Sequence, residues 1–225
     1  MAGFSDAAKD GALQNQIASY FQVSLHTADS GNTGANEVAG GTYARVSTTW
    51  GTVGIPTQDS VTGSTVIINV PASTTIQFWG LWSPLLTAPA SPAVNALTSP
   101  AGTFAAGTYF WKITGTNDAG ETTGSTEVSV AVALNGSALL SWAALPQGTT
   151  GVNIYRGTAT NAENVLVASL GACTSFLDKG AAGTAATVPA SNTTQAFCTG
   201  GQLPAPVTYS SAGTYSGVPT LNAAG

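Results

Sequence analysis

Short apolar segments separated by turn residues recur through the second half of the chain, and this pattern constrains the fold more than any other feature. The segments are rich in β-branched or aromatic residues, and turn residues such as Asn135-Gly136 and Pro146 lie between them. Even spacing of such segments predicts an antiparallel β-sandwich. The predicted strands are residues 108–116, 125–133, 138–142, 152–156, 165–169 and 174–177. The predicted core is Phe110 or Trp111, with Val128, Val130, Leu140, Trp142, Ile154 and Tyr155.

The first eighty residues combine one helical pattern with further strand patterns. Ser5 is a suitable N-cap, and apolar residues recur at helical spacing from Leu13 to Phe21, which predicts a helix over residues 5–19. Further strands are predicted at residues 21–25, 43–50, 66–70 and 76–82.

The predicted helix suggests how the chain associates. A helix this short is marginal alone and needs a packing partner. We therefore predict a homo-oligomer, with a trimer as one option, in which Leu13, Ile17 and Phe21 are buried. Trp79 and Trp82 are further candidates for a contact, because aromatic residues are enriched at interfaces, with burial in the core as their alternative.

Proline punctuates the middle of the chain. Residues 83–100 carry Pro84, Pro89, Pro92 and Pro100, which predicts a stiff linker into a new domain. A second loose stretch, residues 183–194, closes that domain. The last thirty residues return to a sparse strand pattern at Phe197 and at residues 207–209.

Charge is scarce in this chain. Charged residues make up 7% of the sequence, against an average near 25%, and the formal net charge is −5. Five Lys and Arg residues make no basic patch, so nucleic-acid binding is not expected. Neither a signal peptide nor membrane insertion is expected, because no basic and apolar leader and no apolar run of about 18 residues occurs. A polar surface with so little charge is expected to be covered by partner subunits.

Candidate chemical groups are few. His26 is the single histidine, and a hydrogen-bonded histidine at a strand end is the favoured interpretation over a catalytic base. Oxygen ligands for Ca²⁺ could come from Asp29, Asn32, Asn36 and Glu37, but their spacing is not that of an EF-hand and suits tight turns better. We expect no enzymatic activity, no cofactor and no metal.

The two cysteines, Cys173 and Cys198, are expected in different structural units and in the reduced state, with a bond between them as the alternative.

Residues 86–179 resemble the fibronectin type III and bacterial immunoglobulin-like domains common in phage structural proteins. The motifs that carry the resemblance are GTYFWKITGTNDAGET, LLSWAALPQGTTGVNIYRGT and TSFLDKG. The resemblance implies that the aromatic strand, the Trp before a proline turn and the Tyr-Arg strand pack into one core. It says almost nothing about function, because such folds host many functions.

Residues 1–83 resemble a small N-terminal domain of phage tail and fibre-type proteins. The motifs are LHTADSG, in which Ser30 stands where proline is common, GGTYAR and IQFWGLW. Residues 195–225 are similar to the continuation of that domain, so the sandwich is expected to be inserted into it. The predicted organisation is a virion-anchoring domain of residues 1–84 and 192–225, small, β-sandwich-like and with a short N-terminal helix. Residues 86–190 form the inserted immunoglobulin-like or fibronectin III-like sandwich, and the chain is mainly β.

The resemblance implies a structural protein of a tailed bacteriophage virion, assembled with other virion proteins. A minor tail, tail-tip or fibre-type component with an outward immunoglobulin-like domain is the first hypothesis. A capsid decoration or head fibre protein is the second. The third is a carbohydrate-binding module that attaches the particle to host cell-surface glycans.

Overall fold

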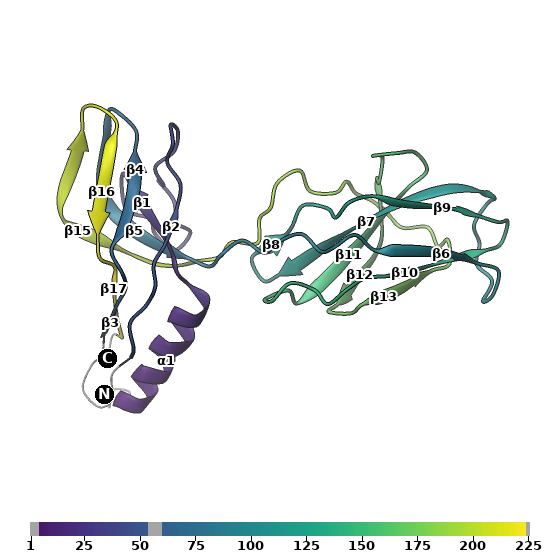
Figure 1. Cartoon of the computed structure of the whole chain (residues 1–225), viewed down its shortest axis with the longest axis horizontal. Coiled ribbons are helices and arrows are strands. Elements are labelled where there is room, and N and C mark those ends of the chain that lie inside the picture. Colours follow the sequence, from purple (N-terminus) through teal and green to yellow (C-terminus); the bar gives the residue numbers. More distant parts are fainter. Residues whose placement is uncertain (1–4, 54–59, 224–225) are drawn as a thin grey trace. The chain divides into compact units, whose positions relative to one another are not determined.

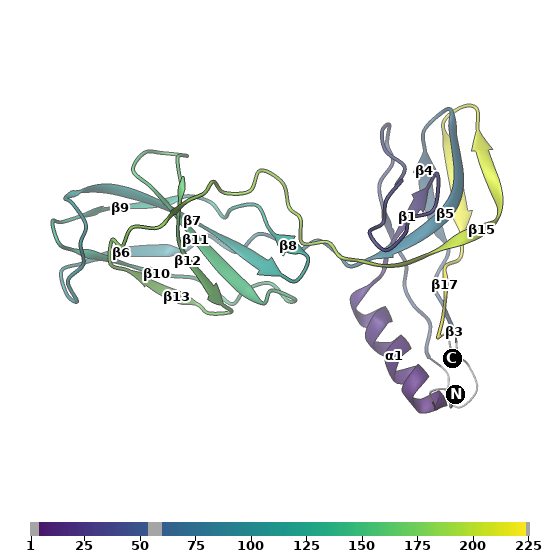
Figure 2. The ribbon, with the colours of Figure 1, turned by 180° about the vertical axis from the view of Figure 1, so that it is seen from behind.

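The structure is a computed structural model that describes residues 5–53 and 60–223. The chain forms two compact units, visible in Figure 1 and, from behind, in Figure 2. Unit 1 comprises Met1–Pro84 and Ala196–Gly225, and unit 2 comprises Leu85–Gln195. Unit 1 is therefore discontinuous in sequence, and each unit is described by itself.

Among the described residues of unit 1, one helix occurs, α1, Asp6–Ser19. It begins where the Ser5 hydroxyl accepts a hydrogen bond from the Ala8 amide, which satisfies one of the free amides of the first turn. It ends at Tyr20, whose backbone is extended. The predicted helix over residues 5–19 is confirmed.

A four-stranded antiparallel sheet forms the centre of unit 1, in the order β15-β5-β1-β2. Register places Leu25 opposite Trp79 and Trp82 opposite Phe197, so the C-terminal segment completes the sheet that contains Phe78, as predicted. Two strand pairs, β16-β4 and β17-β3, complete the unit. The bounds are β1 Gln22–His26, β2 Val46–Ser47, β3 Ser60–Thr62, β4 Val66–Val70, β5 Thr74–Trp82, β15 Phe197–Tyr209, β16 Gly213–Gly217 and β17 Thr220–Asn222.

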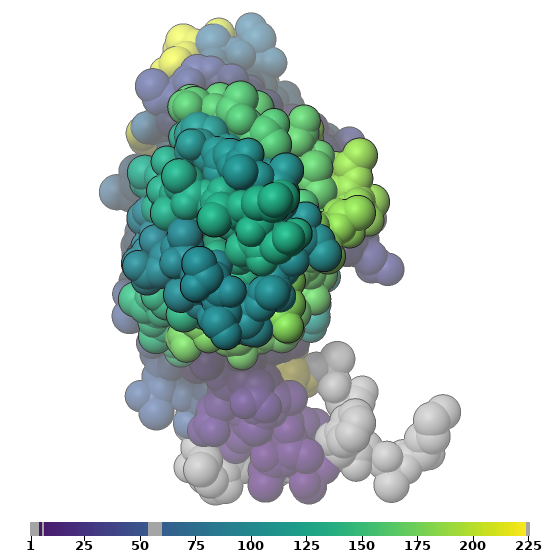
Figure 3. Space-filling model, turned by 90° about the vertical axis from the view of Figure 1, so that its right-hand side faces the viewer, coloured from purple at the N-terminus to yellow at the C-terminus, as the bar shows by residue number. Residues whose placement is uncertain are grey.

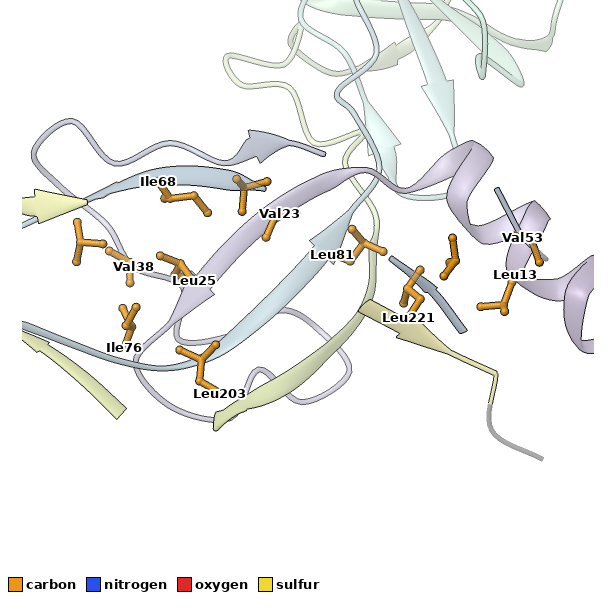
Figure 4. Close-up of a cluster of buried hydrophobic side chains, with 13 residues drawn as sticks. Leu13, Val23, Leu25, Val38, Val53, Ile68, Ile76, Leu81, Leu203 and Leu221 are labelled. Atoms are coloured by element: carbon orange, nitrogen blue, oxygen red, sulfur yellow. The ribbon is translucent and has the colours of Figure 1, made fainter. Parts of the chain in front are cut away.

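The core of unit 1 gathers side chains from both ends of the chain. In β4, buried and exposed residues alternate as a half-buried strand requires, and Val66, Ile68 and Val70 face inward. Figure 4 shows these strands and α1 contributing to one cluster, in which Leu13 lies near Leu221. Burial of Leu13 by its own unit supplies the packing that a short helix needs.

Unit 2 is a two-sheet β-sandwich. One sheet has the order β13-β10-β6, and the other has the order β14-β12-β11-β7-β8 with β9 paired to β7. Both sheets contribute to one core, Trp111 and Ile154 from one side and Leu140 from the other. The bounds are β6 Ala93–Leu97, β7 Gly107–Asn117, β8 Gly120–Glu121, β9 Val128–Val132, β10 Ser137–Ser141, β11 Gly151–Gly157, β12 Val165–Gly171, β13 Ser175–Asp178 and β14 Thr184–Ala185.

The predicted mainly β class with sandwich-like architecture is confirmed. The strand connections add a detail, since β6 pairs with β10 while the intervening β7 and β9 pair in the opposite sheet. In an immunoglobulin constant domain the first two strands are instead neighbours in one sheet. Figure 3 looks onto the end of unit 2 where segments near residues 100 and 135 meet, joined by a hydrogen bond from the Gly102 amide to the Asn135 carbonyl.

Two sequence interpretations need correction. Residues 93–97, predicted as part of a linker, form β6, because Pro89 and Pro92 are buried and direct the chain into the sheet. Residues 43–50, predicted as one strand, contain only the two residues of β2, since Tyr43 and Arg45 are used in side-chain contacts to a neighbouring loop. The prediction left Phe110 and Trp111 as alternatives for the core aromatic residue, and the core residue is Trp111, which is fully buried.

Candidate functional site

The motif residues of unit 1 converge on a buried chain of hydrogen bonds. The Trp82 indole donates to the Ser24 hydroxyl at 2.9 Å, and Ser24 Oγ lies 2.7 Å from His26 Nε2. His26 Nδ1 lies 2.7 Å from the Ala35 carbonyl. Ser24 and His26 are both 0% exposed. The expectation of a hydrogen-bonded histidine at a strand end is confirmed, because His26 is the last residue of β1.

This geometry fixes the tautomer of the neutral His26 imidazole. A carbonyl only accepts, so Nδ1 carries the proton, and Nε2 of the neutral ring then accepts from the Ser24 hydroxyl. The hydroxyl in turn accepts from the Trp82 indole. Every polar atom of this Trp82–Ser24–His26 chain of hydrogen bonds, called the relay below, therefore has a partner when the imidazole is neutral. Burial lowers the pKa of His26 below its ordinary value, and this outweighs the hydrogen bond to Ala35, which acts in the opposite direction.

An ion pair closes over the same network. Arg45 donates to both carboxylate oxygens of Glu37, at 2.8 Å and 2.6 Å, and its guanidinium lies 3.5 Å from the centre of a Trp82 ring. Tyr43 donates to Glu37 at 2.9 Å and accepts from the Leu25 amide, while burial raises the pKa of its phenol. These contacts hold the loop after β1 against the sheet.

Close approach of the loop to Trp82 requires glycine at position 34. A Cβ there would lie 2.1 Å from the Trp82 ring, and the φ of +70° also favours glycine. Trp82 is 9% exposed and makes an edge contact with Phe197 at 5.0 Å between ring centres. The LHTADSG, GGTYAR and WGLW motifs therefore describe one packing arrangement.

A serine beside a histidine could suggest nucleophilic catalysis, but a nucleophile must reach its substrate. Ser24 Oγ is closed in by Trp82, His26 and Gly80, where a Cβ would lie only 2.6 Å from the hydroxyl oxygen. The arrangement fixes a loop and leaves no room for an acyl group at the serine.

Three of the four residues considered for Ca²⁺ are engaged in contacts within the fold. Asp29 accepts from the Gly31 amide, Asn36 donates to the Asp29 carbonyl, and Glu37 holds Arg45. Within residues 5–53 and 60–223, no group of three or more His, Cys, Asp or Glu side chains is placed to bind a metal ion.

Unit 2 has a polar centre of its own around Asp178, in the FLDKG motif. Its carboxylate accepts from the Trp111 indole at 3.0 Å, from Arg156 at 2.9 Å and from the Gly180 amide at 2.8 Å. The guanidinium of Arg156 lies 5.0 Å from the Phe104 ring centre. Three of the segments that resemble fibronectin-like domains thus meet at one carboxylate.

A second acidic group lies in a cleft of about 440 Å³ on unit 2. Lys112 Nζ is 3.2 Å from Glu163 Oε2, and Glu127 accepts from the Asn161 amide at 2.5 Å. The neighbouring Glu163 lowers the pKa of Glu127, while burial raises the pKa of Glu163.

The five predicted contact residues divide into two groups. Leu13 is 1% exposed in a single chain, and Trp82 is used by the relay, so the structure assigns both to the core of unit 1 rather than to a subunit contact. Ile17 and Phe21 are half-buried. Trp79 is half-buried too, and it lines a cavity of about 330 Å³ within unit 1.

That cavity includes residues that the sequence interpretation missed. Gln202 and Tyr215, both from the C-terminal segment, lie beside Trp79 in its wall. Glycine and tyrosine alternate in residues 209–217, and this pattern could have pointed to Tyr215, because an aromatic ring often packs over a glycine at a neighbouring position in a sheet.

Both cysteines are free thiols, Cys173 in unit 2 and Cys198 in unit 1. Burial raises the pKa of the Cys198 thiol. Among the described residues, no helix is long and apolar enough to cross a bilayer. No family model and no curated protein matches this chain.

Proposed function

We propose that this chain is a non-enzymatic structural protein of a tailed bacteriophage virion, a minor tail, tail-tip or fibre-type component. Unit 1 anchors it to the particle, and unit 2 is an added sandwich that projects outward. The starting point is the resemblance of residues 1–83 to phage tail and fibre-type domains. Support comes from the motif residues themselves, since His26, Glu37, Tyr43, Arg45 and Trp82 are committed to internal contacts.

One observation carries the proposal for the two units. The chain leaves unit 1 after Trp82 and returns at Phe197, and these residues are partners in adjacent antiparallel strands. Ser83 and Ala196 are joined by two hydrogen bonds, from the Ser83 amide to the Ala196 carbonyl at 2.9 Å and from the Ala196 amide to Ser83 Oγ at 2.8 Å. A domain inserted between such neighbouring ends leaves the host sheet continuous, which is why insertions succeed at such sites.

This geometry suits display. Unit 2 can be added, lost or exchanged while the β5-β15 pairing of unit 1 is kept. A chain in which only 7% of all residues are charged also suits a protein whose faces contact other virion proteins and further copies of itself. A homo-oligomer therefore remains part of the proposal, with Ile17, Phe21 and Trp79 as the contact candidates that keep some exposure.

Immunogold labelling of the intact particles that encode this chain tests the proposal. An antibody against unit 2 should label the tail or its tip without prior disruption of the particle. Label on the head would replace the tail assignment with the capsid-decoration alternative. Label that appears only on free protein, with particles unlabelled before and after disruption, would overturn the proposal.

A further inference from the structure

A lysine, an asparagine and a glutamate meet in the cleft of unit 2. Lys112 Nζ lies 3.2 Å from Asn161 Oδ1 and 3.2 Å from Glu163 Oε2, so one amine contacts both an amide and a carboxylate. Lys112 belongs to β7, whereas Asn161 and Glu163 belong to the connection between β11 and β12. Lys112 and Asn161 are 49 positions apart in sequence, so the fold brings these groups together.

The three groups have the chemistry of an amide-forming reaction. A lysine amine is a nucleophile once it has lost its charge. The side-chain amide of asparagine offers an electrophilic carbonyl carbon, and its nitrogen can leave as ammonia. A carboxylate in contact with the amine can accept the proton that the amine must lose.

The contact distances place the reacting atoms near each other. The Asn161 carbonyl carbon is about 1.2 Å from Oδ1, so Lys112 Nζ is at most about 4.4 Å from the carbon that it would attack. A productive approach is about 3–3.5 Å, and a rotation within the lysine side chain supplies the difference. Both partners are confined: Glu127 accepts from the Asn161 amide at 2.5 Å, and a Cβ on Gly124 would lie 3.2 Å from Lys112 Cδ.

Burial divides the three side chains as the reaction requires. The side chain of Glu163 is 2% exposed and that of Lys112 is 19% exposed, so the base and the nucleophile are shielded from water. Asn161 is exposed, so released ammonia has a way out. Glu163 Oε1 is buried and has no hydrogen-bond partner within the described residues, and burial raises the pKa of the Glu163 carboxyl. Its carboxylate therefore holds a proton from Lys112 more readily than an exposed one would.

We propose that Lys112 and Asn161 form an intramolecular amide cross-link, with Glu163 carrying the proton. The Lys112 ammonium gives one proton to Glu163, and the electron pair of Nζ forms a bond to Asn161 Cγ. Glu163 gives its proton to Asn161 Nδ2, the Cγ–Nδ2 bond breaks with its electron pair on Nδ2, and ammonia leaves. The ammonia takes the surplus proton of Nζ and departs as ammonium, and Glu163 is again a carboxylate. One amide replaces another, so no further reactant is needed.

The proposal goes beyond the virion role and does not depend on it. The cross-link would tie β7 to the β11–β12 connection across 49 positions of sequence. A covalent bond that closes a loop of this length stabilises a fold mainly because it restricts the unfolded chain. It would give unit 2 resistance to unfolding without a disulfide.

Mass spectrometry of the denatured full chain tests the proposal. The cross-linked chain should be about 17 Da lighter than its sequence, because one ammonia is lost. Trypsin should fail to cleave after Lys112, so residues 46–156 and 157–179 should appear as one joined peptide. Full mass in the purified chain, both fresh and after long incubation at neutral pH, would overturn the proposal.

A succinimide at Asn161 is the main competitor, since it also releases ammonia and gives the same mass. It would leave trypsin free to cleave after Lys112, and it would persist in Lys112→Arg. That variant keeps the positive charge beside Glu163 but lacks the amine, so it should have full mass. A lighter Lys112→Arg chain would overturn the proposal.

Two asparagines of the same cleft supply the matched control. Asn161→Ala should have full mass, whereas Asn164→Ala changes another exposed residue of the cleft wall and should stay about 17 Da lighter. Glu163→Gln should slow the reaction about 100-fold or more, so this variant should keep full mass when the wild type is already lighter. A lighter Asn161→Ala chain, or cross-linking of Glu163→Gln as complete as in the wild type, would overturn the proposal. These results would leave the labelling of virions by the antibody unaffected.

Discussion

Substitution of Ser24 by alanine removes the centre of the relay in unit 1. The Trp82 indole would lose its acceptor, and His26 Nε2 would lose its donor, while both groups stay buried. A water molecule could not replace the hydroxyl easily, since Ser24 is 0% exposed and the Gly80 backbone closes the site.

The cost follows from the two groups left without partners. Each buried polar group that loses its hydrogen bond costs about 1–3 kcal/mol, so the two groups together should destabilise unit 1 by roughly 2–6 kcal/mol in Ser24→Ala. A typical domain is stable by about 5–15 kcal/mol, so the variant should fold but with much weaker protection. Unit 2 has a separate core and should keep its stability.

Native-state hydrogen exchange measures this within one sample. Amides of β1 and β5 should exchange faster in Ser24→Ala, and amides of β7 and β11 serve as the internal reference. Ser47→Ala is the matched control, because its hydroxyl accepts from Gln22 at an exposed position. Equal losses below about 0.5 kcal/mol in both variants would refute the idea that the relay stabilises unit 1.

Three further predictions follow from the same contacts. Because burial lowers the pKa of His26 in the folded state, the unfolded chain binds more protons than the folded chain below about pH 6.5. Unit 1 should therefore lose stability as the pH falls through that value, by up to about 1.4 kcal/mol per pH unit. His26→Gln should flatten this slope in urea titrations, and an unchanged slope would contradict the prediction. Asp178→Asn should lower the free energy of unfolding of unit 2, measured by urea titration, by about 3 kcal/mol, because the largely buried charge of Arg156 loses its partner. A loss below about 1 kcal/mol would contradict the idea that the Asp178 carboxylate stabilises unit 2. Truncation after Gly180 should abolish amide protection in unit 1, because β15, β16 and β17 are lost. Replacement of residues 85–195 with a short Gly-Ser link should preserve that protection. The reverse pattern would mean that the C-terminal segment is a mere extension of unit 1.

The regular strands could be predicted from sequence because their burial follows the pleat. Residues 66–70 read as a strand and form β4 with the same bounds, since alternate valine and isoleucine side chains face the core. The helix was predictable for a similar reason, as Ser5 caps it and Leu13 marks its buried side.

Other features depend on partners that lie far away in sequence. β6 is read as part of a linker because the prolines on either side of it dominate the local signal, yet β10 supplies its hydrogen bonds. The sequence around His26 does not predict its link to Trp82, which is 56 positions away. The two side chains are joined through Ser24, and only the β1-β5 register brings the three together. The cavity at Trp79 needs Gln202 and Tyr215, and no local pattern joins them to β5. Long-range pairing therefore accounts for what the local patterns omit.

Quantitative mass spectrometry of density-purified virions tests whether this chain is a built-in component of a tailed phage particle. We expect the chain to copurify with the particle in a fixed small whole-number ratio to the major tail protein and to stay bound through high-salt washes. A chain that is abundant in the lysate but absent from washed particles would contradict the claim.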